Sequence, residues 1–151
     1  MRAKILNASA GSGKTYQLAY KYVRDVIDQP GLYRHILAVT FTNKATEEMK
    51  SRILKEIHRL ASGGASPYLG NLCRELSLDE RSVRKRAAEV RSKILHDYSR
   101  FTVLTIDTFF QRILRAFIKE LGIDLNYNVE IETASVLSKG ADTLIEQITV
   151  D

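Results

Sequence analysis

Apolar positions along the chain form short continuous runs and longer stripes with helical spacing. The runs, at residues 4–6, 36–41 and 101–106, predict buried strands of a parallel sheet. Stripes with i, i+4 spacing predict helices that cover this sheet. Their members are Leu18, Ala19, Tyr22, Val23, Val26 and Ile27; Ala45, Met49, Ile53, Ile57 and Leu60; Val83, Ala87, Val90, Ile94 and Tyr98; and Phe109, Ile113, Phe117 and Leu121. The alternation of strands and helices predicts an α/β fold.

Turn and cap signals separate these predicted elements. Residues 30–31 (Pro-Gly) stop the first helix, and the Gly and Ser-Pro residues within 63–67 mark a loop. Thr42 or Asn43 can cap the second helix. Residues 77–80 read as a capping box that opens the third helix.

Composition permits one folded domain with a nucleic-acid partner. The chain has 151 residues, 44% hydrophobic and 27% charged, and a formal net charge of +5. The third helix carries basic residues, which are interpreted either as a solvated face or as a DNA contact. They are Arg81, Arg84, Lys85, Arg86 and Arg91.

Other function classes receive little support. Cys73 is the single cysteine, so no internal disulfide can form, and the three histidines lack metal-ligand spacing. No apolar run is long enough to cross a bilayer, and no signal-peptide core is visible. We therefore expect a cytoplasmic protein with no membrane partner.

Residues 8–15 carry the strongest chemical signal. They read Ala-Ser-Ala-Gly-Ser-Gly-Lys-Thr, a Walker A phosphate loop with Ala8 in place of the first glycine. Gly11 and Gly13 let the backbone N–H groups point at phosphate oxygens, Lys14 reaches the β- and γ-phosphates, and the Thr15 hydroxyl binds Mg²⁺. A chance Gly-Ser-Gly turn would not require Lys-Thr after it. The predicted ATP contacts are Ala8, Ser9, Ala10, Gly11, Ser12, Gly13, Lys14, Thr15 and Tyr16.

Three segments in order resemble one helicase family. Residues 8–15 resemble motif I of the UvrD/Rep group of superfamily 1 helicases, residues 38–53 resemble motif Ia, and residues 104–114 resemble motif Ib. The helical segment 63–100 looks more like the RecB and AddA branch, the motor subunits of bacterial recombination helicase–nucleases. The resemblance covers residues 1–121 well and the tail loosely.

The resemblance implies a domain organisation and a set of partners. Residues 1–121 would form the N-terminal part of a RecA-like ATP-binding motor domain with a helical insertion at about 63–100. Residues 122–151 would begin an inserted helical subdomain. ATP and Mg²⁺ are the implied cofactors. Single-stranded DNA is the implied partner, and a second helicase–nuclease subunit is a further candidate.

The resemblance also implies DNA contacts, and the sheet geometry supports them. Ligands of open parallel sheets bind beyond the carboxyl ends of the strands, where hydroxyl, amide and aromatic side chains suit phosphates and unpaired bases. The implied contacts are Phe41, Thr42, Asn43, Thr105, Asp107 and Phe109.

Several of these roles have competing interpretations. Phe41 could pack in the core, and Asn43 could simply cap a helix. Asp107 stands where the family usually has His, so helix capping competes with a DNA role. The family's adenine-reading Gln has no counterpart, and Gln17 lies too near the loop to replace it.

The leading prediction is a motor that couples ATP hydrolysis to movement along single-stranded DNA, in repair or recombination. Another P-loop enzyme such as a kinase, or a nucleotide-switch binding module, stays open as an alternative. No apolar strand ends in an Asp-Glu pair after the phosphate loop, so a Walker B carboxylate is missing, as is a second motor domain. We expect the chain to be part of a longer protein and to be inactive alone.

Overall fold

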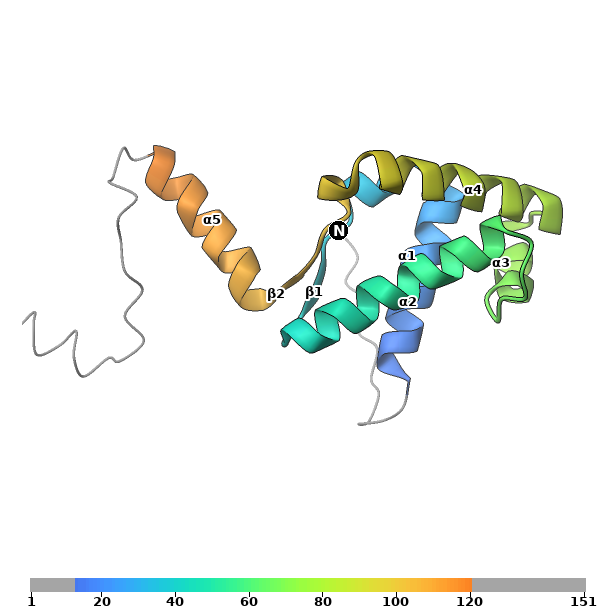
Figure 1. Cartoon of the computed structure of the whole chain (residues 1–151), viewed down its shortest axis with the longest axis horizontal. Coiled ribbons are helices and arrows are strands. Elements are labelled where there is room, and N and C mark those ends of the chain that lie inside the picture. The colour runs from blue at the N-terminus through green and yellow to red at the C-terminus, as the bar shows by residue number, and fades with distance from the viewer. Residues whose placement is uncertain (1–12, 121–151) are drawn as a thin grey trace, which may run out of the picture. The chain divides into compact units, whose positions relative to one another are not determined.

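The computed structural model describes residues 13–120, and the chain divides into two compact units, Met1–Gln111 and Arg112–Asp151. Helices dominate the described part (Figure 1). Its elements are α1 (Lys14–Asp28), the 3₁₀ turn η1 (Leu32–Arg34), β1 (Ala38–Thr40), α2 (Asn43–Ala61), α3 (Leu69–Leu76), α4 (Glu80–His96), the 3₁₀ turn η2 (Tyr98–Arg100), β2 (Val103–Thr105) and α5 (Ile106–Glu120).

The sheet of the described part is small. β1 and β2 pair in parallel, with Ala38 opposite Val103 and Thr40 opposite Thr105. Both strands lie inside the predicted runs at 36–41 and 101–106, and the run at 4–6 lies outside the described residues. The α/β prediction is therefore confirmed only in part, since the described residues form a mostly helical structure on two short strands.

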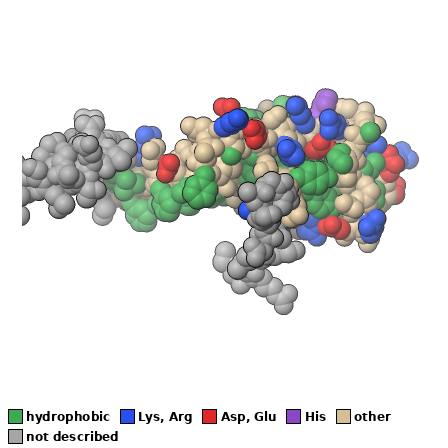
Figure 2. All heavy atoms as spheres, turned by 90° about the horizontal axis from the view of Figure 1, so that it is seen from below, with side chains coloured by type: hydrophobic (Ala, Val, Ile, Leu, Met, Phe, Trp, Pro, Cys, Tyr) green, Lys and Arg blue, Asp and Glu red, His purple; other side chains and the backbone are tan. Residues whose placement is uncertain are grey.

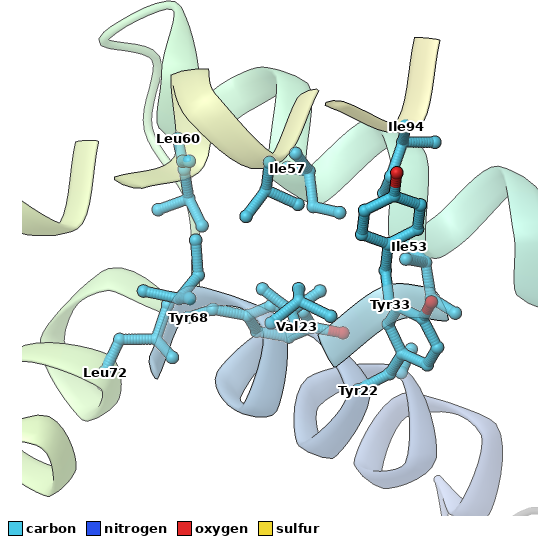
Figure 3. Close-up of a cluster of buried hydrophobic side chains, with 14 of the residues drawn as sticks. Tyr22, Val23, Tyr33, Ile53, Ile57, Leu60, Tyr68, Leu72 and Ile94 are labelled. Atoms are coloured by element: carbon cyan, nitrogen blue, oxygen red, sulfur yellow. The ribbon is translucent and has the colours of Figure 1, made fainter. Parts of the chain in front are cut away.

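The core of the first unit lies between the helices. α2 packs against both α4 and α1, and α3 packs against α4. Figure 3 shows apolar side chains from these elements converging on one cluster. Ile53, Ile57 and Leu60 of α2 and Ile94 of α4 are at most 1% exposed. Each such aliphatic side chain stabilises the fold by roughly 1.5–3 kcal/mol through burial.

The predicted stripes are confirmed along most of α1, α2 and α4 and wrong at their margins. Leu18 is 46% exposed and lines an open cavity of about 260 Å³ beside β1, and Tyr98 is 49% exposed. Phe117 of α5 is 58% exposed, although Ile118 beside it is buried. A stripe shows which residues share a face, but burial also needs an element that covers the face. Hydrophobic side chains are accordingly visible along α5 in Figure 2.

The structure places two helix boundaries differently from the sequence prediction. α4 is capped by Asp79, whose side chain accepts a hydrogen bond of 3.2 Å from the Ser82 N–H, and not by Ser77. The hydrogen bonds with Ser82 lower the pKa of Asp79. Ser77 instead ends α3 in the left-handed region, at φ 52°. The turn residues in the sequence do not reveal that α3 ends at Ser77. The predicted cap of α4 therefore lies two residues before the observed one, Asp79.

The basic residues of α4 do not form one solvated face. The Arg84 guanidinium donates to the carbonyl oxygens of Leu60 and Gly64, both at 3.2 Å. The Arg86 guanidinium donates to the carbonyl oxygens of Ile27 and Asp28 at 3.3 and 2.9 Å. The two arginines therefore bind the C-terminal ends of α2 and α1, where carbonyl oxygens without a helical partner attract cations. Figure 2 shows Lys and Arg side chains interspersed with acidic ones on the face of the molecule that it presents.

Within residues 13–120, no helix is long and apolar enough to span a membrane.

Candidate nucleotide-binding and DNA-binding site

The described end of the phosphate loop is the start of α1. Gly13 precedes the helix with φ 77° and ψ 21°, a left-handed conformation that glycine adopts without strain. Among the described residues an added Cβ would meet only the Tyr16 Cβ, at 4.0 Å, and the positive φ favours glycine here. Residues Ala8, Ser9, Ala10, Gly11 and Ser12 lie outside the described residues, so their predicted contacts stay predictions.

The first turn of α1 has the chemistry of an anion site. Lys14 and Thr15 are both exposed, and no acidic residue lies in this turn. Free N–H groups and the helix dipole make such a terminus electropositive. The Lys14 ammonium adds a full charge, and the Thr15 hydroxyl is open to a ligand. This part of the loop therefore fits the polyphosphate of ATP.

A Mg²⁺ ion at Thr15 would need further ligands. Residues 13–120 contain no group of three or more His, Cys, Asp or Glu side chains that could hold a metal ion by themselves. A magnesium ion in a P-loop protein is held by one or two protein oxygens together with phosphate oxygens and water. Thr15 fits this arrangement as a single ligand.

Phe41, directly after β1, is fully available to a ligand. Its side chain is 85% exposed, so the alternative interpretation of core packing is wrong. The aromatic face of such a residue can stack on an unpaired base.

The two polar residues after Phe41 have different roles in the local structure. The Thr42 hydroxyl caps α2 by accepting a hydrogen bond of 3.1 Å from the Ala45 N–H. Asn43 is the exposed first residue of α2. The cap interpretation therefore belongs to Thr42 and not to Asn43. The Asn43 amide is placed where it could reach a ligand at the helix terminus.

Threonine hydroxyls make the turn between β1 and α2 rigid. Thr40 Oγ1 and Thr46 Oγ1 lie 2.6 Å apart, so one hydroxyl donates to the other. The accepting hydroxyl is free to donate to the Thr42 carbonyl oxygen, which lies 3.2 Å from Thr40 Oγ1 and 3.1 Å from Thr46 Oγ1. A turn held in this way presents its exposed residues in one conformation, which favours ligand binding because little conformational entropy is lost.

The end of β2 repeats this design. Thr105 is only 7% exposed, and its hydroxyl accepts a hydrogen bond of 3.2 Å from the Thr108 N–H at the start of α5. Thr105 thus takes the capping role considered for Asp107, which is exposed in the first turn of α5. Phe109 is half-buried beside Phe110, with the ring centroids 5.7 Å apart. The predicted DNA roles of these residues stay predictions.

The parallel register brings the ends of β1 and β2 together. Thr40 pairs with Thr105, so the segments that follow both strands begin at the same edge of the sheet. This edge joins an exposed aromatic ring, an amide and two helix N-termini, all from residues that the sequence pattern marked. Such groups contact phosphates and unpaired bases in protein–nucleic acid complexes.

Comparison with known proteins places the chain. Residues 2–150 match the family model of the UvrD/REP helicase N-terminal domain. The chain belongs to this family. Membership agrees with the resemblance of the phosphate loop and of the segments after β1 and β2, and it identifies the two-stranded sheet as part of a UvrD/REP helicase N-terminal domain.

Relatives of this UvrD/REP domain include components of helicase–nuclease enzymes. The chain is 30% identical to the RecBCD enzyme subunit RecB of Escherichia coli over 128 residues, which are 80% of the chain and 11% of that protein. It is 31% identical to an ATP-dependent helicase/nuclease subunit of Clostridium novyi over 149 residues, or 97% of the chain and 10% of that protein. The chain thus spans about a tenth of the length of these relatives. No solved structure matches it.

One cluster beside the start of α1 has no counterpart among the site residues predicted from the sequence. Tyr68 contacts the first turn of α1, and hydrogen bonds link it through Ser66 to Glu56. The signal that could have found it is Glu56, which shares the stripe of Ile53, Ile57 and Leu60 and is only 6% exposed. A carboxylate on a buried face requires polar partners.

Proposed function

We propose that this chain supplies the ATP-binding end of a motor that couples ATP hydrolysis to movement along single-stranded DNA. One observation carries the proposal. The parallel register of β1 and β2 puts Phe41, Asn43 and the start of α5 at one edge of the sheet. The same chain carries an electropositive, acid-free turn at the end of a phosphate loop. Both features are expected in a helicase N-terminal domain, and the chain belongs to a family of such domains.

The chain's own residues bind and orient the nucleotide in this proposal. Lys14 pairs with the β- and γ-phosphates, and the first N–H groups of α1 donate to phosphate oxygens. The Thr15 hydroxyl would hold the Mg²⁺ ion. MgATP, when bound, supplies the transferred phosphoryl group and the free energy of its hydrolysis. Residues 8–13 would complete the cradle.

The residues that follow β1 and β2 bind single-stranded DNA in this proposal. Phe41 stacks on an unpaired base, while Asn43 and the N-terminus of α2 donate hydrogen bonds to a phosphate. Asp107 would accept a hydrogen bond from a base, since its carboxylate repels phosphate. Because the relatives are named as helicase–nuclease and RecBCD subunits, we further propose a role in DNA repair or recombination beside a second subunit.

Replacing Lys14 with Ala tests the nucleotide role. We expect DNA-stimulated ATP hydrolysis by the full-length protein that contains this chain to fall by about a hundredfold or more, the effect of removing one charge-stabilising donor. Lys21→Ala is the matched control, because Lys21 is an exposed lysine two turns further along the same helix. The measurement is phosphate release with and without single-stranded DNA.

Three results would contradict the proposal. Unchanged turnover in Lys14→Ala would remove the role of the phosphate loop. Hydrolysis by the wild type that is indifferent to DNA would favour a P-loop enzyme of another kind, such as a kinase. Nucleotide-dependent DNA binding without turnover would favour a nucleotide switch.

A further inference from the structure

The first turn of α1 is held by a tyrosine that lies far away in the sequence. Tyr68, which precedes α3, is 1% exposed, and its hydroxyl donates to the carbonyl oxygen of Tyr16 at 3.4 Å. Its ring lies edge-on to the rings of Tyr16 and Tyr20, with centroids 5.0 and 5.2 Å away. Tyr16 directly follows Lys14 and Thr15, so Tyr68 contacts the same turn that carries the proposed phosphate and metal groups.

Tyr68 is itself fixed by a chain of hydrogen bonds from α2. The buried Glu56 carboxylate accepts from Ser66 Oγ at 2.7 Å and from Arg59 at 2.7 Å. Ser66 Oγ in turn accepts from the Tyr68 N–H at 3.2 Å. The loop between α2 and α3 therefore has one preferred conformation, and the position of Tyr68 depends on Glu56 and Ser66.

The Tyr68 hydroxyl keeps its proton under physiological conditions. Burial raises its pKa to about 12, so it is a hydrogen-bond donor at neutral pH. Figure 3 shows Tyr68 beside Leu72 and near Leu60, on the side of the apolar cluster where α2 and α3 approach α1. A donor fixed in a packed core can hold a backbone carbonyl in place more firmly than a mobile surface group can.

From this geometry we infer that Tyr68 is a positioning residue for nucleotide binding, acting through the Tyr16 carbonyl on the orientation of Lys14 and Thr15. The inference rests on the proposed function of the phosphate loop. It adds that the loop between α2 and α3 sets the geometry of the turn that receives the phosphates. A typical hydrogen bond, lost without a cavity, corresponds to about a two- to tenfold change in an equilibrium constant.

The test compares Tyr→Phe variants of the full-length protein that contains this chain. Tyr68→Phe keeps the ring contacts with Tyr16 and Tyr20 and removes only the hydroxyl. We expect the Kd for MgADP and the KM for ATP to rise about two- to tenfold, with kcat and single-stranded DNA affinity changed by less than about twofold. Ser66→Ala should shift the Kd in the same direction. Calorimetry or fluorescence titration gives the Kd, and phosphate release gives KM and kcat.

Tyr22→Phe is the matched control, since the buried Tyr22 hydroxyl has no hydrogen-bond partner among the described residues and should not affect nucleotide affinity. A Kd for MgADP that stays at the wild-type value in Tyr68→Phe, whether or not its melting temperature falls, overturns the inference and leaves Tyr68 a purely structural residue. A wild type that fails to bind MgADP overturns the proposed function instead, so the two failures are distinguishable.

Discussion

Phe41 shows how one exposed side chain separates stability from binding. At 85% exposure its replacement by Ala creates no cavity, so we expect the free energy of unfolding to change by no more than about 0.5 kcal/mol. Single-stranded DNA affinity should fall by about 1–3 kcal/mol if the ring stacks on a base. Urea unfolding and fluorescence anisotropy with labelled DNA measure the two quantities.

Phe101→Ala is the control for this prediction, because Phe101 is 4% exposed and lies edge-on to Tyr22. Its loss should cost about 3–5 kcal/mol of stability. A Phe41→Ala variant that loses stability to a similar extent, with DNA affinity retained, would show that Phe41 is covered in the folded protein and does not bind DNA.

At single positions the sequence predicted the type of chemistry better than the assignment of roles. A cap at residue 42 or 43 was expected, and only the folded structure could show that the Thr42 hydroxyl provides it and leaves Asn43 exposed. Tyr68 had no local signal, because its role depends on contacts with Tyr16 and Tyr20 some fifty residues away. Local patterns encode helix ends and not such tertiary contacts.

At the scale of elements, arginines of α4 hold the helices of the first unit together. Arg84 donates to carbonyl oxygens at the end of α2 and also pairs with Glu80 at 2.7 Å. We expect Arg84→Ala to lower the free energy of unfolding by about 1–3 kcal/mol, the usual effect of losing hydrogen bonds to a charged group. Arg81→Ala, an exposed neighbour on the same helix, should change it by less than about 0.5 kcal/mol.

Urea unfolding of both variants, together with DNA titration, decides whether Arg84 contacts DNA or links α4 to the end of α2. If Arg84→Ala weakened DNA binding while leaving stability unchanged, Arg84 would be a DNA contact and not a link between α4 and α2. Sequence spacing could not separate these cases, since a guanidinium that reaches a neighbouring helix and one that reaches solvent have the same position in the stripe.

The same reasoning explains which elements were predicted well. α1, α2 and α4 were recognisable because each has a partner helix that buries its stripe. α5 has an equally regular apolar face, yet Phe110, Leu114 and Phe117 are exposed on it. Amphipathicity is a property of one segment, whereas burial is a property of a pair of segments.

At the scale of the whole molecule, the catalytic groups that the chain supplies predict weak nucleotide binding without ATP turnover. Lys14 and Thr15 supply one phosphate-binding charge and one metal ligand. Phosphoryl transfer also requires a second group on the metal, an oriented water and stabilisation of the developing charge from outside. The sequence has no strand ending in an Asp-Glu pair after the phosphate loop. The chain spans only about a tenth of the relatives that are named as helicase–nuclease subunits.

We therefore expect the 151-residue chain by itself to bind ATP weakly and to hydrolyse it at a rate near background, with or without single-stranded DNA. An arginine finger alone accelerates phosphoryl transfer by about a thousandfold or more. Hydrolysis by this chain would lack that contribution and also the carboxylate that positions the attacking water. The measurement is an ATP titration beside a phosphate-release assay, with Lys14→Ala as the control for specific binding. DNA-stimulated turnover by this chain would mean that it carries a metal-binding carboxylate and a charge-stabilising group that the Walker pattern does not reveal, and Asp107 and the arginines of α5 would then be the first residues to replace.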